Sequence, residues 1–204
     1  DLYRNYEIAG SGHATPDELN FAAASADIEK GGRAVPPMAC NEGPRSRFPN
    51  WPAFNAILRN LDVWVRTGTP PPHAEPILVV DGKPVLDRFG NVIGGIRSPY
   101  VDAPTSTWFG NSTGPSFCRI AGHEVPLDRT LLQTLYKNAD EYQQVAQDAA
   151  RFQDTLRKAS VPNPVSPWDD DKERRVKGLT PAQKTAWENS PVRRAQASRS
   201  VVPL

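Results

Sequence analysis

Cysteine and histidine are scarce in this sequence, and that scarcity bears on metal binding. The 204 residues include two cysteines, Cys40 and Cys118, and three histidines, His13, His73 and His123. The cysteines lack the short spacing of metal-ligand pairs, and the histidines fall in what we predict to be different loops, so we expect no structural zinc site and no cofactor. The two cysteines could form a disulfide in an oxidising compartment or remain buried thiols in a reducing one. The sequence leaves both states open.

Long apolar runs and an excess of charge of one sign are also absent. No stretch approaches the roughly 18 apolar residues of a membrane-spanning helix, and no basic, apolar leader opens the chain. Because 24 Lys and Arg oppose 23 Asp and Glu, the formal net charge is +1, and no strong field for a polyanion results. We therefore expect a soluble chain with no membrane span and no nucleic-acid partner. A secreted or periplasmic location would follow if Cys40 and Cys118 are bridged.

Proline, in contrast, is abundant. The chain has 21 prolines and a mean hydropathy of −0.54, which predicts many turns and a polar, irregular architecture. Its length suits one domain, since domains usually hold about 100 to 200 residues. We predict helices and loops with too few strands for an independent sheet.

The first residues alternate between apolar and polar. This pattern at residues 2–8 predicts a half-buried strand. The strand would end in Ala9-Gly10-Ser11-Gly12-His13-Ala14, where two glycines permit a tight bend that presents His13 beyond the strand. Spacing alone leaves two alternatives for His13, a loop histidine bonded to a backbone carbonyl or a residue with a chemical role.

Four further segments carry clear patterns. Residues 51–66 have helical spacing, with Pro52 suited to the first turn and Gly68 to the stop. Residues 77–86 predict a β-hairpin with an Asp-Gly turn. Residues 127–135 and 139–159 predict two helices, the second long and amphipathic.

The end of the chain differs in composition. From residue 161 onward prolines and charges rise and apolar residues thin out. We predict that residues 1–160 form the folded part. Residues 161–204 are expected to form a polar, partly disordered tail with at most one short helix at 181–188.

Several segments resemble the bacterial "alpha/beta hydrolase domain" family of serine hydrolases. The residues that carry the resemblance are Tyr6-Glu7-Ile8-Ala9-Gly10-Ser11-Gly12-His13-Ala14, Pro37-Met38-Ala39-Cys40-Asn41, residues 61–71, residues 94–101 and Phe117-Cys118-Arg119-Ile120-Ala121-Gly122. The first of these is similar to the family's histidine segment, which makes His13 the expected catalytic histidine. The resemblance spans roughly residues 3–160 and does not extend to the tail.

The resemblance implies an α/β class and an activity. In α/β-hydrolases the triad follows the chain order nucleophile, acid, histidine, so the nucleophile and the acid are expected upstream of residue 1. The chain would then be the C-terminal part of an α/β-hydrolase fold, with helices and loops around one or two late strands. Residues 31–135 would line the active-site rim. The implied partners are a small ester-like substrate and the upstream half of the same domain. The 204 residues alone are expected to be inactive and prone to associate, because apolar surface would be left exposed at Tyr6, Ile8, Phe54, Leu58 and Trp64.

Other residues could also be given chemical roles. Gly110-Asn111-Ser112-Thr113-Gly114 matches the G-x-S-x-G pattern, but Pro115 follows where a nucleophile elbow needs a helix, so we interpret it as a glycine-rich turn. Asp17 and Glu18 are interpreted as helix-capping residues rather than as the triad acid. Arg97 could bind a substrate carboxylate or form a structural ion pair.

A non-enzymatic function is the main alternative. The amphipathic helix predicted at 139–159 could dock on a partner, which would make the chain a binding or scaffold module. Trp51, Phe54 and Trp64 lie at helical spacing, and we interpret them as packing residues rather than as a substrate platform.

Overall fold

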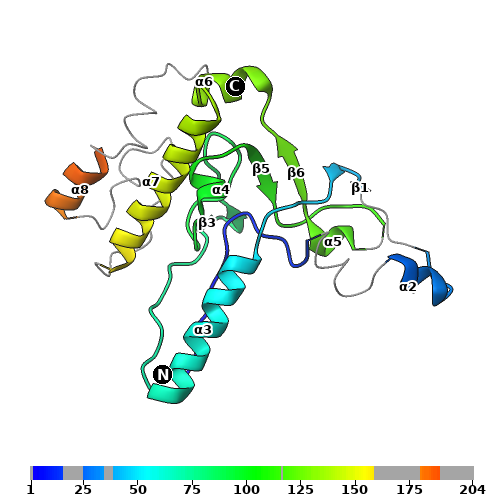
Figure 1. The fold of residues 1–204 in the computed structure, drawn as a ribbon, viewed down its shortest axis with the longest axis horizontal. Coiled ribbons are helices and arrows are strands. Elements are labelled where there is room, and N and C mark those ends of the chain that lie inside the picture. Colours follow the sequence, from blue (N-terminus) through cyan, green and yellow to red (C-terminus); the bar gives the residue numbers. More distant parts are fainter. Residues whose placement is uncertain (1, 16–24, 35–38, 116, 159–179, 189–204) are drawn as a thin grey trace. The chain divides into compact units, whose positions relative to one another are not determined.

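A computed structural model describes residues 2–15, 25–34, 39–115, 117–158 and 180–188 of the chain (Figure 1). The described residues form helices and three separate two-stranded sheets. They divide into two compact units, each made of three chain segments. Unit 1 comprises residues 1–2, 10–72 and 107–125, and unit 2 comprises residues 3–9, 73–106 and 126–204. Each unit is described separately below.

Unit 1 contains very short elements apart from one helix. Its strands are β1 (Ala39–Cys40), β2 (Gly43–Pro44), and most of β5 (Ser106–Phe109) and β6 (His123–Pro126). Strands β1 and β2 pair antiparallel, and β5 pairs with β6. The short helices are α2 (Ser25–Lys30) and α5 (Cys118–Ala121). Edge-to-face packing of Phe48 on Trp108, with ring centroids 5.5 Å apart, supplies buried aromatic surface.

Helix α3 (Trp51–Thr67) confirms the predicted helix at 51–66. Pro52 lies in its first turn, and Gly68 ends it with φ 71°, donating its N–H to the Trp64 carbonyl at 2.8 Å. All of α3 lies in the described part of the chain, and none of its residues is buried. Large apolar side chains are exposed along one face: Trp51, Phe54, Leu58, Leu61 and Val65.

The exposure of α3 tests the expectation that apolar surface is left open and the expectation that its aromatic residues pack. Phe54 is 44% exposed and Leu58 is 62% exposed, which confirms that the 204 residues leave them open. Tyr6, Ile8 and Trp64, also expected to be exposed, are half-buried. The packing role of Trp51 and Phe54 is not fulfilled within the described residues. Because the helix has an apolar face without cover there, it does not stabilise unit 1 by burial.

Unit 2 contains a buried apolar cluster. Helices α6 (Arg129–Leu135) and α7 (Ala139–Lys158) confirm the helices predicted at 127–135 and 139–159, and α7 contacts the short helix α4 (Pro99–Asp102). Asp128 caps α6 by accepting the Leu131 N–H at 2.9 Å. The buried members of the cluster are Phe89, Ala103, Leu135, Tyr136 and Val145. The core of unit 2 is therefore built from helix against loop.

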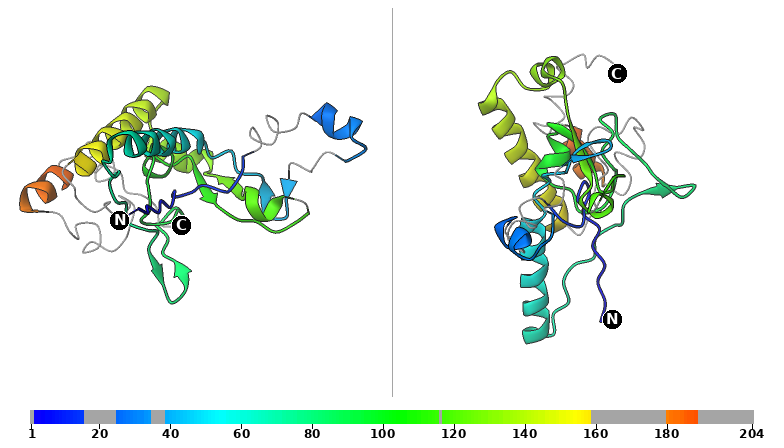
Figure 2. Two further views of the ribbon diagram at one scale, coloured as in Figure 1. Left: turned by 90° about the horizontal axis from the view of Figure 1, so that it is seen from below. Right: turned by 90° about the vertical axis from the view of Figure 1, so that its right-hand side faces the viewer.

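A hairpin also belongs to unit 2. Strands β3 (Val79–Val80) and β4 (Lys83–Pro84) pair antiparallel, and Figure 2 shows them as a narrow two-stranded projection. The turn is Asp81-Gly82, with φ values of 50° and 73°. Both residues occupy the left-handed region that a type I′ turn needs, which confirms the predicted hairpin.

The strand predicted at residues 2–8 is wrong. The described chain forms a single parallel bridge there, between Ile8 and Ile96, and Leu2 is 93% exposed. A strand is stabilised by a partner along its whole length, and within unit 2 only the end of this segment has one. Helix α8 (Pro181–Glu188) confirms the short helix predicted at 181–188. Most of the predicted tail lies outside the described residues, and the boundary at residue 160 stays a prediction.

Among the described residues, no helix has both the length and the apolar character that crossing a membrane requires.

A buried and an exposed leucine allow the assignment of the core to be tested. Leu135 is 3% exposed, and we predict that Leu135→Ala lowers the free energy of unfolding by about 2–5 kcal/mol, because truncation leaves a cavity in the unit 2 core. Leu58→Ala, at an exposed site of α3, should change it by less than about 0.5 kcal/mol. Urea unfolding monitored by circular dichroism measures both. Equal losses for the two variants would contradict the assignment of the core.

Candidate functional site

The His13 loop is fixed through its backbone. Gly10 has φ 84°, and the chain then passes close to α5. A Cβ atom at Gly12 would lie 2.6 Å from the Ala121 carbonyl oxygen, so a side chain there is excluded. The His13 N–H donates to the Ile120 carbonyl at 2.7 Å. The glycines at 10 and 12 therefore permit a close approach that seats His13 on α5.

The imidazole of His13 is exposed. It makes no hydrogen bond, ion pair or ring contact with the part of the chain that the structure describes. Asp17 and Glu18, interpreted above as capping residues, lie outside the described residues. His13 thus combines a held backbone with an imidazole open to a partner, an arrangement suited to proton transfer once a reacting group is close.

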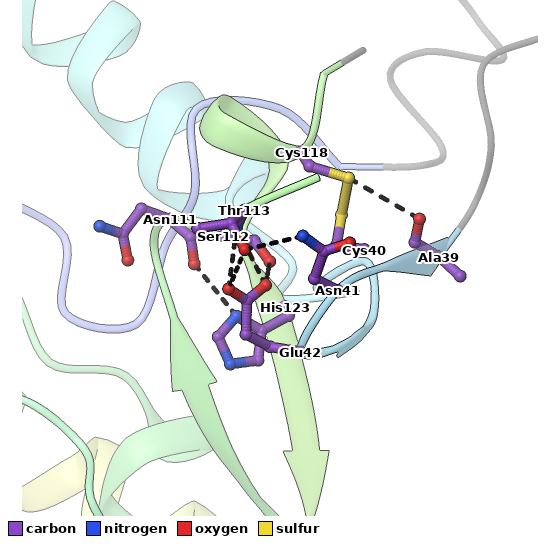
Figure 3. Close-up of a disulfide and its surroundings, with 9 residues drawn as sticks. All are labelled: Ala39, Cys40, Asn41, Glu42, Asn111, Ser112, Thr113, Cys118 and His123. Atoms are coloured by element: carbon purple, nitrogen blue, oxygen red, sulfur yellow. Dashed lines mark hydrogen bonds between the residues drawn. A yellow bond between two sulfur atoms is a disulfide. The ribbon is translucent and has the colours of Figure 1, made fainter. Parts of the chain in front are cut away.

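A disulfide joins two distant segments beside this loop (Figure 3). Cys40 of β1 and Cys118 of α5, separated by 78 residues, are bonded, with Cα atoms 5.6 Å apart. The structure thereby selects the bridged state from the two that the sequence left open. Cys118 is fully buried and Cys40 is half-buried.

An acidic turn lies next to the disulfide. Glu42 accepts hydrogen bonds from the Ser112 hydroxyl, from the Thr113 N–H at 2.9 and 3.0 Å, and from the Thr113 hydroxyl (Figure 3). Asn41 adds a backbone bond to the Thr113 carbonyl at 3.0 Å. The Ser112 hydrogen bond, followed by those from Thr113, lowers the pKa of Glu42 to about 2. The turn at 41–42 is thus fastened to the loop at 112–113.

Comparison with known proteins identifies the family. A family described as "alpha/beta hydrolase domain" matches residues 1–155 of the 204. The chain belongs to this family. No curated protein and no solved structure matches it. The resemblance drawn from the sequence is confirmed, and membership in an alpha/beta hydrolase family indicates the hydrolase superfamily.

Ser112 lacks the setting of a hydrolase nucleophile. It follows β5, but the next helix, α5, begins at Cys118, so no helix start lies beside the serine to form an oxyanion hole. Its hydroxyl donates to Glu42, and the side chain is 7% exposed. The G-x-S-x-G pattern is therefore a loop in which the serine holds the Glu42 turn.

His123 is buried in unit 1. It is the first residue of β6, so its predicted position in a loop is wrong. Its ring stacks on Phe109, with centroids 4.2 Å apart and planes 6° from parallel. Its Nδ1 lies 3.1 Å from the Asn111 carbonyl oxygen, and because a carbonyl only accepts, Nδ1 carries the proton (Figure 3). His123 packs and fastens the loop at 111, and sequence gave no signal for this role.

Arg97 forms a structural ion pair, one of its two predicted alternatives. Its Nε donates to Asp102 at 2.7 Å, and Asp87 lies 3.8 Å away. Further bonds run to the carbonyls of Val92 at 2.6 Å and Val101 at 3.3 Å. The Arg97 side chain has no exposed surface, so it cannot meet a substrate in this arrangement. It links α4 to the loop segments at Asp87 and Val92 instead.

Arg45 is also buried, but within the described part of the chain its guanidinium lacks the hydrogen-bond partners that Arg97 has. The residue is 1% exposed, and its three guanidinium nitrogens have no hydrogen-bond partner among the described residues. Burial lowers the pKa of its guanidinium. Its backbone bridges antiparallel to His123. Because a buried cation without partners is costly, we expect Arg45 to destabilise the described part of the chain.

Acidic, histidine and cysteine side chains are dispersed in the described structure. Within the described ranges, no group of three or more such residues could hold a metal ion. Glu42 and Arg45 were not singled out from the sequence. The one available signal for Glu42 was its position two residues after Cys40, which gains meaning only once Cys40 is known to pair with Cys118.

Removing the charge of Arg97 and removing that of Arg45 are expected to change the free energy of unfolding in opposite directions. Arg97→Met should lower the free energy of unfolding by about 3–5 kcal/mol, because it strands buried carboxylates. Arg45→Met should raise it by about 1–4 kcal/mol, because it removes an unpaired buried charge. Chemical denaturation of both variants tests this. A destabilised Arg45→Met would indicate a counter-charge for Arg45 that the described residues do not supply.

Glu42 gives a stability that depends on pH. Its folded pKa of about 2 lies below the ordinary value of 4.5, so its contribution is complete above pH 4.5 and is lost as the pH falls toward 2. We expect Glu42→Gln to lower the melting temperature at pH 7 and to flatten its decline between pH 4.5 and 2. Thermal melts over this range measure the effect. Glu29→Gln, on the exposed surface of α2, is the matched control and should leave the decline unchanged.

Proposed function

We propose that this protein is a serine hydrolase of esterase type in which His13 serves as general base and then as general acid. The observation that supports this is a histidine with a fixed backbone and an exposed imidazole, in a chain that belongs to the alpha/beta hydrolase domain family. A catalytic histidine must be held in position and still reach its serine, and these two features meet both needs.

The proposed reaction has two halves. His13 takes the proton from a serine hydroxyl as the oxygen attacks the ester carbonyl, and it returns that proton to the leaving alcohol. Water then attacks the acyl-enzyme, with His13 as base, and releases the acid and the free serine. A carboxylate would orient the imidazole and stabilise its charged form.

The serine and the acid of this triad are proposed to lie upstream of residue 1. The α/β-hydrolase order places both before the histidine, and Ser112 is unsuitable because its hydroxyl is engaged by Glu42 and it lacks an adjoining helix start. In this view the 204 residues form the C-terminal part of the hydrolase fold and are inactive alone. The exposed apolar face of α3 supports this view, since the helix would cover the upstream half of the same domain.

The substrate is proposed to be a small ester. Residues 31–135 would contribute to the rim that selects it. Location in an oxidising compartment, secreted or periplasmic, is the proposal that best suits the Cys40–Cys118 disulfide.

A scaffold function based on the helix at 139–159 receives less support. Tyr142, Val145 and Ala146 of α7 pack in the core of unit 2. The apolar face that a partner would need is therefore occupied as far as these residues extend.

Removal of the imidazole tests the proposal. The complete gene product should hydrolyse p-nitrophenyl esters, and His13→Ala should lower kcat by about 10³-fold or more, because the serine loses its base. His73→Ala, an exposed histidine of the other unit, is the matched control and should retain full activity.

Two results would contradict the proposal. The first is an active His13→Ala variant. The second is a gene whose reading frame encodes no strand-serine-helix elbow upstream of Asp1, which DNA sequencing of that region determines. Either would leave a binding role as the better account.

A further inference from the structure

The backbone of His13 rests on one very short helix. The N–H groups of His13 and Ala14 both point to the Ile120 carbonyl, at 2.7 and 3.4 Å, and Gly12 passes against Ala121. Ile120 and Ala121 are the last two residues of α5, which has four residues. The position of His13 is therefore set by the position of α5.

Helix α5 needs an external anchor. A single turn has too few internal hydrogen bonds to be stable by itself, and those of α5 run from Ile120 and Ala121 to the Phe117 carbonyl. The first residue of α5 is Cys118, and its covalent bond to Cys40 ties the helix to the β1–β2 turn. This disulfide is the strongest connection that α5 makes.

The other end of the disulfide is itself fixed. Asn41 and Glu42 follow Cys40 directly, and six hydrogen bonds join them to Ser112 and Thr113 (Figure 3). All these residues, together with α5 and His13, belong to unit 1. A continuous path therefore runs from the fastened turn through the disulfide and α5 to the His13 backbone.

We propose that the Cys40–Cys118 disulfide is a positioning device for His13 and that its reduction by a dithiol switches hydrolysis down. This inference rests on the proposed catalytic role of His13. Without the cross-link, α5 loses its covalent anchor and the His13 backbone loses its fixed acceptor. A displacement of about 1 Å at a catalytic group can cost about 100-fold in rate.

The redox step balances with a dithiol as reductant. A thiolate attacks the sulfur of Cys40, because residue Cys40 is half-buried whereas Cys118 is fully buried. Cys118 then leaves as a thiolate that takes up a proton. The second thiol of the reductant then displaces Cys40, which leaves as a thiol. Two electrons and two protons pass to the protein, and the reductant becomes a disulfide. The Cys118 thiol could then donate to the Ala39 carbonyl, whose oxygen lies 3.7 Å from its sulfur.

The experiment compares the oxidised and the dithiothreitol-treated complete gene product. Amide hydrogen exchange at His13, whose N–H is bonded to Ile120, should accelerate by about tenfold or more on reduction. The Leu78 amide, bonded to Ile93 in unit 2 at 2.8 Å, is the internal control and should keep its protection. On p-nitrophenyl esters, kcat should fall by about 10- to 100-fold with KM little changed, and reoxidation should restore it. Cys40→Ser should behave as the reduced protein and be insensitive to dithiothreitol.

The outcomes separate this inference from the proposed function. Unchanged His13 exchange and kcat on reduction, with His13→Ala inactive, would overturn the positioning role and leave the hydrolase proposal standing. Loss of Leu78 protection on reduction would also overturn it, because general unfolding would then explain the lost activity. Faster His13 exchange in a protein whose His13→Ala variant keeps its activity would show that the disulfide holds the His13 loop in place. It would overturn both the catalytic role of His13 and the control of hydrolysis through His13.

Discussion

The covalent bond between Cys40 and Cys118 is the constraint on which the structure of unit 1 depends. Its strands β1 and β2 have two residues each, and α5 has four, so none of them is stable by itself. The disulfide closes a loop of 78 residues, which restricts the unfolded chain, and it brings Glu42 to Ser112 and Thr113. The hydrogen bonds to the Glu42 carboxylate then hold these segments together, as the backbone hydrogen bonds of a larger sheet would.

Unit 2 is held together by a different combination. Its apolar cluster joins α6 and α7 to Phe89 and Ala103, and Arg97 links α4 to the loop segments at Asp87 and Val92. Each nitrogen of that guanidinium has a hydrogen-bond partner, whereas the guanidinium nitrogens of Arg45 in unit 1 have none among the described residues. Burial thus has opposite consequences for two arginines of the same chain.

The hydrolase proposal connects these features to function. His13 has a fixed backbone and an open imidazole, and α3 has an open apolar face. A further part of an α/β-hydrolase domain would use the imidazole for chemistry and the apolar face of α3 for packing. The family match over residues 1–155 includes both.

The sequence by itself determined the elements whose signals are local. Pro52 and Gly68 bound α3, Asp81-Gly82 makes the hairpin turn, and the spacing of Tyr142 and Val145 predicts α7, because these patterns act over a few residues. The strand expected at residues 2–8 failed because a strand depends on a distant partner, and among the described residues only Ile96 pairs with it. Tertiary structure alone decided the pairing of Cys40 with Cys118, the bonds of Glu42 to Ser112 and the choice between the two roles of Arg97. The disulfide and the Glu42 bonds join residues 70 or more positions apart, and Arg97 also needed its loop to fold around it, so no periodicity in the sequence could report any of them.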